Sequence, residues 1–367
     1  MIPRAAENRM LLVAGITLAL IGSLIIRQYL PVQYLLDDAH LRDAMGGGGI
    51  LTDAESFSLI AEGYRMMGLD AAPPLAGLLG MLIFSTAVLL AISWQDLSRI
   101  TVPTLLLIGV VFVPGLVYLG QFSKEIVTAL LALLVLALPA GNTAGRRLLA
   151  EIAIVAAALA YGVLLRPYWL IIAALYVVVR LTLPRTRHPL ALLAIPAVAF
   201  AILQPLFLEV LGSGLQGQRE WSNAERPAGT EVATLIPSIA PDATGVVGVL
   251  AALAMVGLML VPLGLLLSGS AFHMAAGVLI TLLWLSVLVP VLRGAYLAPR
   301  GEHRSGAATS RQVRATRAAA LLLSVVMVQA LFEPDYGSVL KHLAPLLPLL
   351  VLIRVQQDLR PRGRRSA

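Results

Sequence analysis

Long apolar segments recur along almost the whole chain, and they restrict its fold more than any other feature of the sequence. They lie at residues 10–29, 75–94, 102–120, 126–140, 148–165, 168–183, 189–211, 245–267, 271–292, 318–332 and 343–357. A helix of about 20 residues crosses a hydrocarbon core of about 30 Å, and in lipid every backbone N–H and C=O group must pair within the protein. The apolar runs show no alternation with polar residues, which favours helices. The sequence therefore predicts an all-α, polytopic membrane protein with a single integral membrane domain over residues 1–367.

The composition excludes several functional classes. Hydrophobic residues make up 59% of the chain and charged residues 13%, with a mean hydropathy of +0.87. These values exclude an ordinary soluble domain. Cysteine is absent, so there is no disulfide, thiolate metal ligand or cysteine nucleophile. No HExxH, Walker A, GxSxG or Rossmann glycine pattern occurs in a matching context. The net charge of +7 does not indicate a nucleic-acid partner, because the basic residues gather in short loops and at the C-terminus.

The basic residues predict the orientation in the membrane. Arg4 and Arg9 precede the first apolar segment, which is too long for a signal peptide and is followed by no A-x-A site. We therefore expect a retained first helix and a cytoplasmic N-terminus. Further basic clusters lie at Arg146–Arg147, Arg180–Arg187, Arg293–Arg317 and Arg360–Arg365, and they mark the cytoplasmic side.

This orientation conflicts with a simple count of the segments. Two plain spans between residues 245 and 292 would place the basic loop 293–317 outside. We expect a re-entrant or interfacial segment there, or a missed span, because Pro262-Leu-Gly264 and Ser268-Gly-Ser270 interrupt this region. The prediction is about 10–12 transmembrane helices with a GT-C-like arrangement as the candidate architecture. Both termini are expected to be cytoplasmic.

Two long polar loops are expected outside, at residues 30–74 and 212–244. In the first, Thr52-Asp-Ala-Glu55 has the pattern of a capping box. Phe57, Ile60, Ala61 and Tyr64 follow at i, i+3, i+4 and i+7. This spacing predicts a short amphipathic helix lying on the membrane surface.

Charged residues at the ends of the apolar segments are the candidates for function, because ionisable groups there are costly unless they face water, protein or a ligand. They are Lys124 and Glu125, then Arg166 with Tyr168, then Glu333 and Asp335 followed by Tyr336, Lys341 and His342. A guanidinium binds phosphate with two N–H groups, a carboxylate can act as a general base, and aromatic rings stack on sugars. The structural alternatives are an arginine that reaches the head groups, a local lysine–glutamate ion pair and a turn capped by acids.

The two loops add further candidates. Arg219, Trp221 and Arg226 lie in the second loop, where a solvated loop is the structural alternative. Asp37 and Asp38 lie in the first loop, and such an acidic pair could bind a divalent cation through its oxygens.

The sequence resembles the Wzy-like and EpsG-like polymerases of bacterial cell-surface polysaccharides. The resemblance rests on Phe122-Ser-Lys-Glu125, Arg166-Pro-Tyr-Trp169 and Phe332-Glu-Pro-Asp-Tyr-Gly-Ser338, together with the polar loop that carries Arg219 and Arg226. It implies a glycosyltransferase-like enzyme for capsule, O-antigen or exopolysaccharide synthesis. Such an enzyme joins oligosaccharide repeats linked to undecaprenyl diphosphate, at the outer face of the inner membrane.

The resemblance also implies roles for the candidate residues. Arg166, Arg219 and Arg226 would hold the diphosphate, and Asp335 or Glu333, with Glu125 as a further candidate, would deprotonate the acceptor hydroxyl. The expected substrate-binding set also contains Lys124, Tyr168, Trp221, Tyr336, Lys341, His342, Asp37 and Asp38. No metal or other cofactor is expected, and a chain-length regulator or export machinery is the expected protein partner.

Three alternatives remain open at this point. A GT-C glycosyltransferase that uses a polyprenyl-phosphate sugar would favour Asp37, Asp38 and Asp53, with a divalent cation. A repeat-unit flippase would need ionisable residues near mid-membrane, whereas the charges here gather at the ends of the segments. A non-catalytic assembly subunit is the third alternative.

Overall fold

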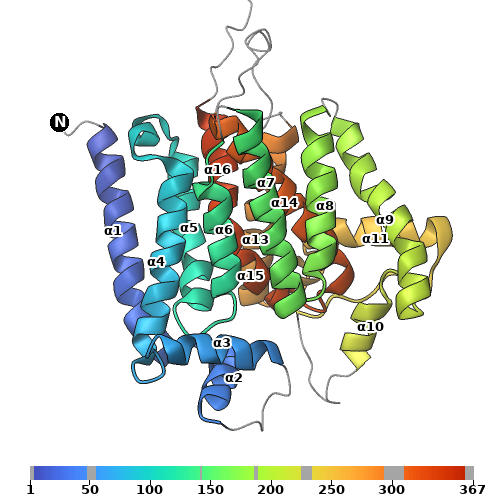
Figure 1. Ribbon diagram of the computed structural model, residues 1–367, viewed down its shortest axis with the longest axis horizontal. Coiled ribbons are helices and arrows are strands. Elements are labelled where there is room, and N and C mark those ends of the chain that lie inside the picture. Colours follow the sequence, from blue (N-terminus) through green and yellow to red (C-terminus); the bar gives the residue numbers. More distant parts are fainter. Residues whose placement is uncertain are drawn as a thin grey trace, which may run out of the picture. The chain divides into compact units, whose positions relative to one another are not determined.

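The computed structural model describes residues 4–47, 55–140, 143–185, 189–224, 234–292 and 310–359 (Figure 1). Over these ranges the chain is helical, and its one β-type pairing is an isolated antiparallel bridge between Leu235 and Asp335. Eight of the described helices are long and apolar enough to cross a membrane, and the helices Ile126–Ala137 and Gly245–Leu260 are shorter and apolar. The prediction of an all-α, polytopic membrane protein is confirmed.

The helices form two compact units. The first unit is made of residues 1–170, 298–318 and 341–367. Its helices are α1 (Arg4–Ile25), α2 (Leu36–Met45), α3 (Glu55–Met66), α4 (Pro73–Ile92), α5 (Val102–Leu119), α6 (Ile126–Ala137), α7 (Ala144–Leu164) and α16 (Leu347–Asp358). Short 3₁₀ turns accompany them: η1 (Ile26–Gln28), η2 (Val32–Tyr34), η3 (Trp94–Arg99) and η6 (Ala344–Leu346).

The second unit is made of residues 171–297 and 319–340. Its helices are α8 (Trp169–Thr182), α9 (Pro189–Leu211), α10 (Gly217–Ala224), α11 (Gly245–Leu260), α12 (Leu263–Leu266) and α13 (Ala271–Leu292), with η4 (Leu183–Arg185). Three helices contribute residues to both units: α8, whose first two residues belong to the first unit, α14 (Ser310–Phe332) and α15 (Tyr336–Leu343).

Two glycines bring α4 close to the end of α5. A Cβ added to Gly77 would lie 2.2 Å from the carbonyl oxygen of Gly120, and one added to Gly80 would lie 2.2 Å from that of Leu119. Any larger residue would therefore push the two helices apart. This close approach fixes the turn of residues 120–125, which connects α5 to α6 and carries Lys124 and Glu125.

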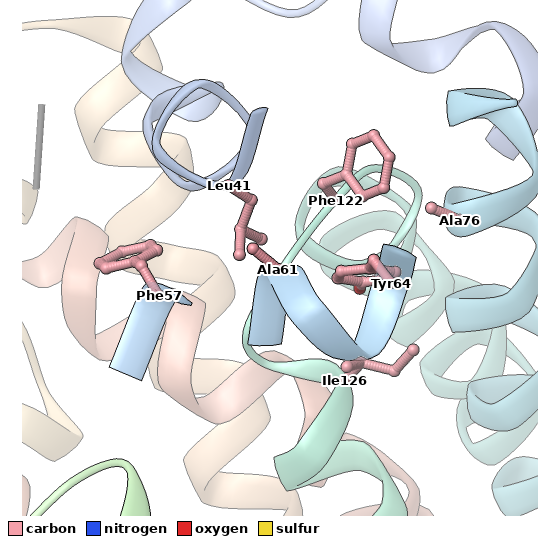
Figure 2. Close-up of a cluster of buried hydrophobic side chains, with 7 residues drawn as sticks. All are labelled: Leu41, Phe57, Ala61, Tyr64, Ala76, Phe122 and Ile126. Atoms are coloured by element: carbon pink, nitrogen blue, oxygen red, sulfur yellow. The ribbon is translucent and has the colours of Figure 1, made fainter. Parts of the chain in front are cut away.

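The amphipathic helix predicted in the first loop is present as α3. In Figure 1, α2 and α3 lie beyond the lower ends of α4 and α6, on the side remote from the N-terminus. The apolar face of α3 packs against protein in a buried cluster made of Leu41, Phe57, Ala61, Tyr64, Ala76, Phe122 and Ile126 (Figure 2). The rings of Tyr64 and Phe122 meet edge to face at 4.9 Å. The face expected to rest on the membrane surface thus covers the α5–α6 turn instead.

The basic loop predicted to end at Arg317 is shorter than expected, because α14 begins at Ser310. Arg311 pairs with Asp96, and Arg317 donates to Glu151 and to the carbonyl of Leu138 just beyond the end of α6. Arginine is a good helix former, and a cation at the C-terminal end of α6 satisfies carbonyls that lack a partner in the helix. Residues 293–309 of this loop, Arg187 and residues 360–367 lie outside the described part of the chain.

The interruptions expected between residues 245 and 292 do end helices. The helix α11 stops at Leu260, before Pro262, and Gly269 takes a φ of +73° between α12 and α13. In Figure 1 α11 runs crosswise to α8 and α9. The number of true membrane crossings in this region stays a prediction.

Candidate functional site

A group of polar side chains that the sequence analysis singled out lies together in the first unit. We call it the Glu125 cluster: Asp37, Lys124, Glu125, Arg166, Tyr168, Lys341 and His342. Its members come from the start of α2, the α5–α6 turn, the α7–α8 turn and the last turn of α15. Residues more than 300 positions apart in the sequence thus meet, as Lys341 and Asp37 do.

Glu125 is the centre of this cluster and is fully buried. Its Oε1 accepts a hydrogen bond from Arg166 and lies 3.5 Å from Nε2 of His342, and its Oε2 accepts from the hydroxyl of Thr128 at 3.3 Å. Burial alone would raise the pKa of Glu125, but the positive charge of Arg166, followed by His342 and Lys341, outweighs burial and lowers it. Glu125 is therefore a carboxylate at neutral pH.

Arg166 is held in place on both sides of its turn. Its Nη1 donates to the hydroxyl of Tyr168 at 2.8 Å, while its backbone N–H bonds to the carbonyl of Tyr161 at 3.1 Å. The rings of Tyr161 and Trp169 pack edge to face at 4.8 Å beneath it. A guanidinium fixed by a buried carboxylate and a tyrosine has little rotational freedom left to lose when it binds a ligand.

Lys341 and Asp37 form a second ion pair, with 2.7 Å between Nζ and Oδ1. Burial would raise the pKa of Asp37, yet Lys341, Lys124 and Arg166 together lower it. Asp37 therefore carries a negative charge among three cations.

Lys124 is the member of the cluster with the least compensation. Its Nζ lies 3.9 Å from the centre of the Phe57 ring, and no carboxylate of the described residues lies within ion-pair distance of it. Burial, helped by the nearby positive charges of Arg166 and Lys341, lowers its pKa to about 8. At neutral pH it is still mostly an ammonium group, held by an aromatic face.

The charges of the cluster do not balance. Lys124, Arg166 and Lys341 are positive, Asp37 and Glu125 are negative, and His342 adds a positive charge when protonated. A partly buried excess of positive charge that includes a guanidinium and two ammonium groups favours a phosphate or diphosphate.

The second aspartate of the first loop has a different environment. A single oxygen of Asp38, Oδ2, accepts from Arg27 at 2.8 Å and from Arg42 at 2.7 Å. The two aspartates, which the alternative reading would use as a pair on a divalent cation, are thus each engaged by basic side chains. No group of three or more metal-ligating residues occurs within the described ranges. Asp53 lies outside them.

Arg219 was expected to contact the substrate, with a solvated loop as the structural alternative, and the structure gives it a buried position in the second unit. The side chain is fully buried and donates to the carbonyls of Gln329, at 3.3 Å, and Ala330. Both carbonyls lie in the last turn of α14, where helix carbonyls begin to lack a backbone partner, although that of Gln329 also accepts from the N–H of Glu333 at 2.9 Å. Burial lowers the pKa of Arg219 to about 10, with Glu333 acting in the opposite direction. The environment of Arg219 is that of a helix cap.

Asp335, the favoured catalytic base of the sequence analysis, caps α15. Its Oδ1 accepts from the backbone N–H of Ser338 at 2.8 Å, and its Oδ2 lies 3.2 Å from the Ser338 hydroxyl. On either side of it, the backbone of residues 334 and 336 bonds to residues 236 and 234 of the second loop. The acid-capped turn, weighed above as the structural alternative, describes this geometry.

The remaining candidates of the second unit differ in exposure. Glu333 and Tyr336 are buried, and the Tyr336 hydroxyl lies 3.3 Å from the carbonyl of Leu258, to which it donates. Trp221 is exposed, with 57% of its surface accessible, on α10. Arg226 lies outside the described residues.

The sequence analysis missed several residues that support the cluster. Thr128 links Glu125 to the hydroxyl of Tyr161 at 3.1 Å, and the hydroxyl of Tyr64 donates to the carbonyl of Ser123 at 2.9 Å. Thr128 lies in the first turn of α6, three residues after Glu125 at the N-cap, so an i, i+3 search from each candidate acid would have found it. Tyr64 was identified only for its apolar face.

Comparison of the chain with protein-family models, with curated proteins and with solved structures returns no match in any of the three.

Proposed function

We propose that this chain is a membrane glycosyltransferase that polymerises oligosaccharide repeats carried on undecaprenyl diphosphate. The observation that carries the proposal is the net positive charge of the Glu125 cluster, in which three cations face two carboxylates. Lys124, Arg166 and Lys341 are three cations from distant parts of the sequence in one partly buried place. A lipid diphosphate carries the opposite charge and reaches an enzyme from the bilayer.

The orientation of the first unit supports an outer-face reaction. Asn8 of α1 donates to the carbonyl of Leu97 at 2.7 Å, so η3 lies at the end where α1 begins. Arg311 pairs with Asp96 of η3, which places the start of α14 at the same end. The helix α5 then leads from η3 to the turn that carries Lys124, a rise of about 27 Å for its 18 residues. By the positive-inside rule the arginine-rich end is cytoplasmic, and the Glu125 cluster is extracytoplasmic.

We assign the general base to His342 in place of Asp335. The oxygens of Asp335 cap α15, whereas Nε2 of His342 lies 3.5 Å from the buried carboxylate of Glu125. A carboxylate beside an imidazole orients the ring and stabilises the imidazolium that forms. His342 takes the proton of the acceptor hydroxyl as its oxygen bonds to the anomeric carbon. The bond from that carbon to the phosphate oxygen breaks, and undecaprenyl diphosphate leaves with the electron pair, stabilised by Arg166 and Lys124.

The test uses undecaprenyl diphosphate, the product of every such transfer whatever the sugar. Purified protein in lipid nanodiscs is titrated with this lipid and binding is read by native mass spectrometry. We expect Lys124→Gln to weaken binding about tenfold or more, as loss of a charge-assisted contact does. Arg65→Gln is the matched control, because Arg65 is exposed on α3 and pairs only loosely with Glu62 at 3.5 Å.

Transfer itself is measured by incubating the nanodiscs with a lipid-diphosphate oligosaccharide and resolving the glycan ladder. His342→Ala should abolish elongation while leaving lipid binding within a few-fold of wild type. Normal ladders from both His342→Ala and Lys124→Gln, in folded protein, would overturn the assignment. Consumption of a polyprenyl-monophosphate sugar instead would favour the GT-C alternative.

A further inference from the structure

The two adjacent aspartates at the start of α2 have different partners, and this difference suggests different roles. Asp38 is clamped by Arg27 and Arg42, and Leu41 on the same helix is fully buried in the apolar cluster of Figure 2. These contacts fix α2 without any contribution from Asp37. Asp37 instead points its charge at Lys341, Lys124 and Arg166.

The carboxylate of Asp37 is only half satisfied. Its Oδ1 accepts from Lys341, but Oδ2 is buried and has no hydrogen-bond partner among the described residues, as is also true of Oδ1 of Asp38. Of the two carboxylates, that of Asp37 is the one whose charge faces Lys341, Lys124 and Arg166. A buried, unsatisfied carboxylate oxygen costs free energy, and native proteins keep such groups where they serve a purpose. Lys124 stands next to it with no carboxylate within ion-pair distance among the described residues.

We infer that Asp37 is a resident counter-ion that occupies the anion-binding position of the Glu125 cluster until the diphosphate of the ligand displaces it from Lys341. This inference rests on the proposed function, because it uses the same three cations. The carboxylate holds Lys341 in place in the empty state and keeps like charges from repelling one another. When the diphosphate binds, Lys341 exchanges one anionic partner for another.

Such a counter-ion competes with the ligand and lowers its affinity. Weak binding of a product helps turnover, because undecaprenyl diphosphate must leave after each transfer. The carboxylate that returns to Lys341 replaces the departing phosphate as its partner. Asp37 therefore sets the affinity for product without touching the acceptor hydroxyl.

The experiment compares Asp37→Asn with wild-type protein in nanodiscs, using inorganic pyrophosphate in one arm and undecaprenyl diphosphate in the other. Removing a competing charge should tighten binding of both by on the order of tenfold. Glu62→Gln removes the same charge from the exposed surface of α3 and should stay within about twofold of wild type. Thermal unfolding shows that each variant is folded, and we expect Asp37→Asn to keep α2 in place because Asp38 and Leu41 hold it.

The outcomes separate this inference from the proposed function. Equal or weaker pyrophosphate binding by folded Asp37→Asn, with wild type binding normally, would overturn the counter-ion and leave the anion site standing. No binding of either probe by any variant would overturn both. Tighter binding by Asp37→Asn in a protein that elongates no glycan would support the counter-ion and remove the polymerase. If Asp37→Asn binds undecaprenyl diphosphate more tightly but pyrophosphate no more tightly, Asp37 competes with the lipid chain and not with the diphosphate. That result would also contradict the inference.

Discussion

Lys124 has a charge that responds to pH in an accessible range. Its pKa of about 8 lies below that of an ordinary lysine because of burial and the neighbouring Arg166. Below this value the side chain is an ammonium group, and above it the amine is neutral. Anion binding that depends on Lys124 must therefore weaken as pH rises through about 8.

We predict a loss of undecaprenyl diphosphate affinity in the wild-type protein between about pH 7 and about pH 9, and its absence in Lys124→Arg. The arginine keeps its charge throughout, so it also corrects for the changing ionisation of the ligand. Binding is measured at each pH by native mass spectrometry or by a fluorescent lipid analogue. Parallel pH profiles for the two proteins would show that Lys124 does not contribute a titrating charge.

Asp335 offers a second contrast at the residue level. As the cap of α15 it satisfies a backbone N–H group, and replacing such a cap by alanine costs about 1 kcal/mol. We predict that Asp335→Ala lowers the thermal stability modestly and leaves glycan elongation within a few-fold of wild type. Asp335→Asn, which retains a cap, should restore the stability. A folded Asp335→Ala protein without any elongation would return the role of base from His342 to Asp335.

The sequence singled out the charged residues that lie together in the first unit, and it did so for a physical reason. Charges at the ends of apolar segments are expensive unless they are compensated. Arg166 and Lys341 pair with the carboxylates of Glu125 and Asp37, whereas Lys124 lies against the ring of Phe57. The same reasoning could not tell a ligand contact from a cap. Asp335 and Arg219 satisfy backbone groups of α15 and α14, and no spacing in the sequence reveals that use.

At the level of the elements, the position of the Glu125 cluster depends on the close approach of α4 to the end of α5. A Cβ added to Gly77 would lie only 2.2 Å from the carbonyl oxygen of Gly120. Gly109, in the middle of α5, has nothing within 4 Å of that position. The two glycines form a matched pair of buried and open sites.

We predict that Gly77→Ala destabilises the protein by about 1–3 kcal/mol or more and weakens lipid binding, because the turn carrying Lys124 must shift. Gly109→Ala should be neutral or stabilise by up to about 1 kcal/mol, since alanine favours the helix and meets no neighbour. Thermal unfolding in detergent ranks the two variants. Equal stability of both would contradict the close packing of α4 on the turn.

Helices with a repeating apolar pattern were the predictable elements, as α3 shows. Its four apolar residues at helical spacing predicted its presence and its apolar face, but not that this face packs on the α5–α6 turn. The short polar helices α2 and α10 were not predicted, because their stability comes from partners elsewhere. Asp38 of α2 is held by Arg27, and Arg219 of α10 by the end of α14. The start of α14 at Ser310 was not predicted for a similar reason. Its arginines are typical of a basic loop in the sequence, and the residues that they pair with, Asp96 and Glu151, are distant along the chain.

At the scale of the whole molecule, the proposal depends on one orientation in the membrane. The first unit has an arginine-rich end, where η3 and the start of α14 lie, and an end that carries α3 and the Glu125 cluster. The apolar segments predict the membrane fold, which depends on the helices alone. The direction of the protein in the membrane is predicted by the positive-inside rule, from the positions of the basic residues.

The absence of cysteine from the chain allows the direction to be measured without background. Ser58 is exposed on α3 and Ser98 is exposed on η3, so Ser58→Cys and Ser98→Cys are matched, conservative probes of the two ends. We predict that a membrane-impermeant maleimide labels Ser58→Cys in intact bacterial spheroplasts and labels Ser98→Cys only after the membrane is opened. The reason is that basic loops stay on the cytoplasmic side during membrane insertion, so the arginine-rich η3 end is cytoplasmic.

The reverse pattern would place the Glu125 cluster in the cytoplasm, where a lipid-linked repeat has not yet crossed the bilayer. Polymerisation at the outer face would then be impossible. Labelling of both probes in intact spheroplasts would show that the two ends do not lie on opposite sides, and the assignment of α5 as a crossing helix between them would fail.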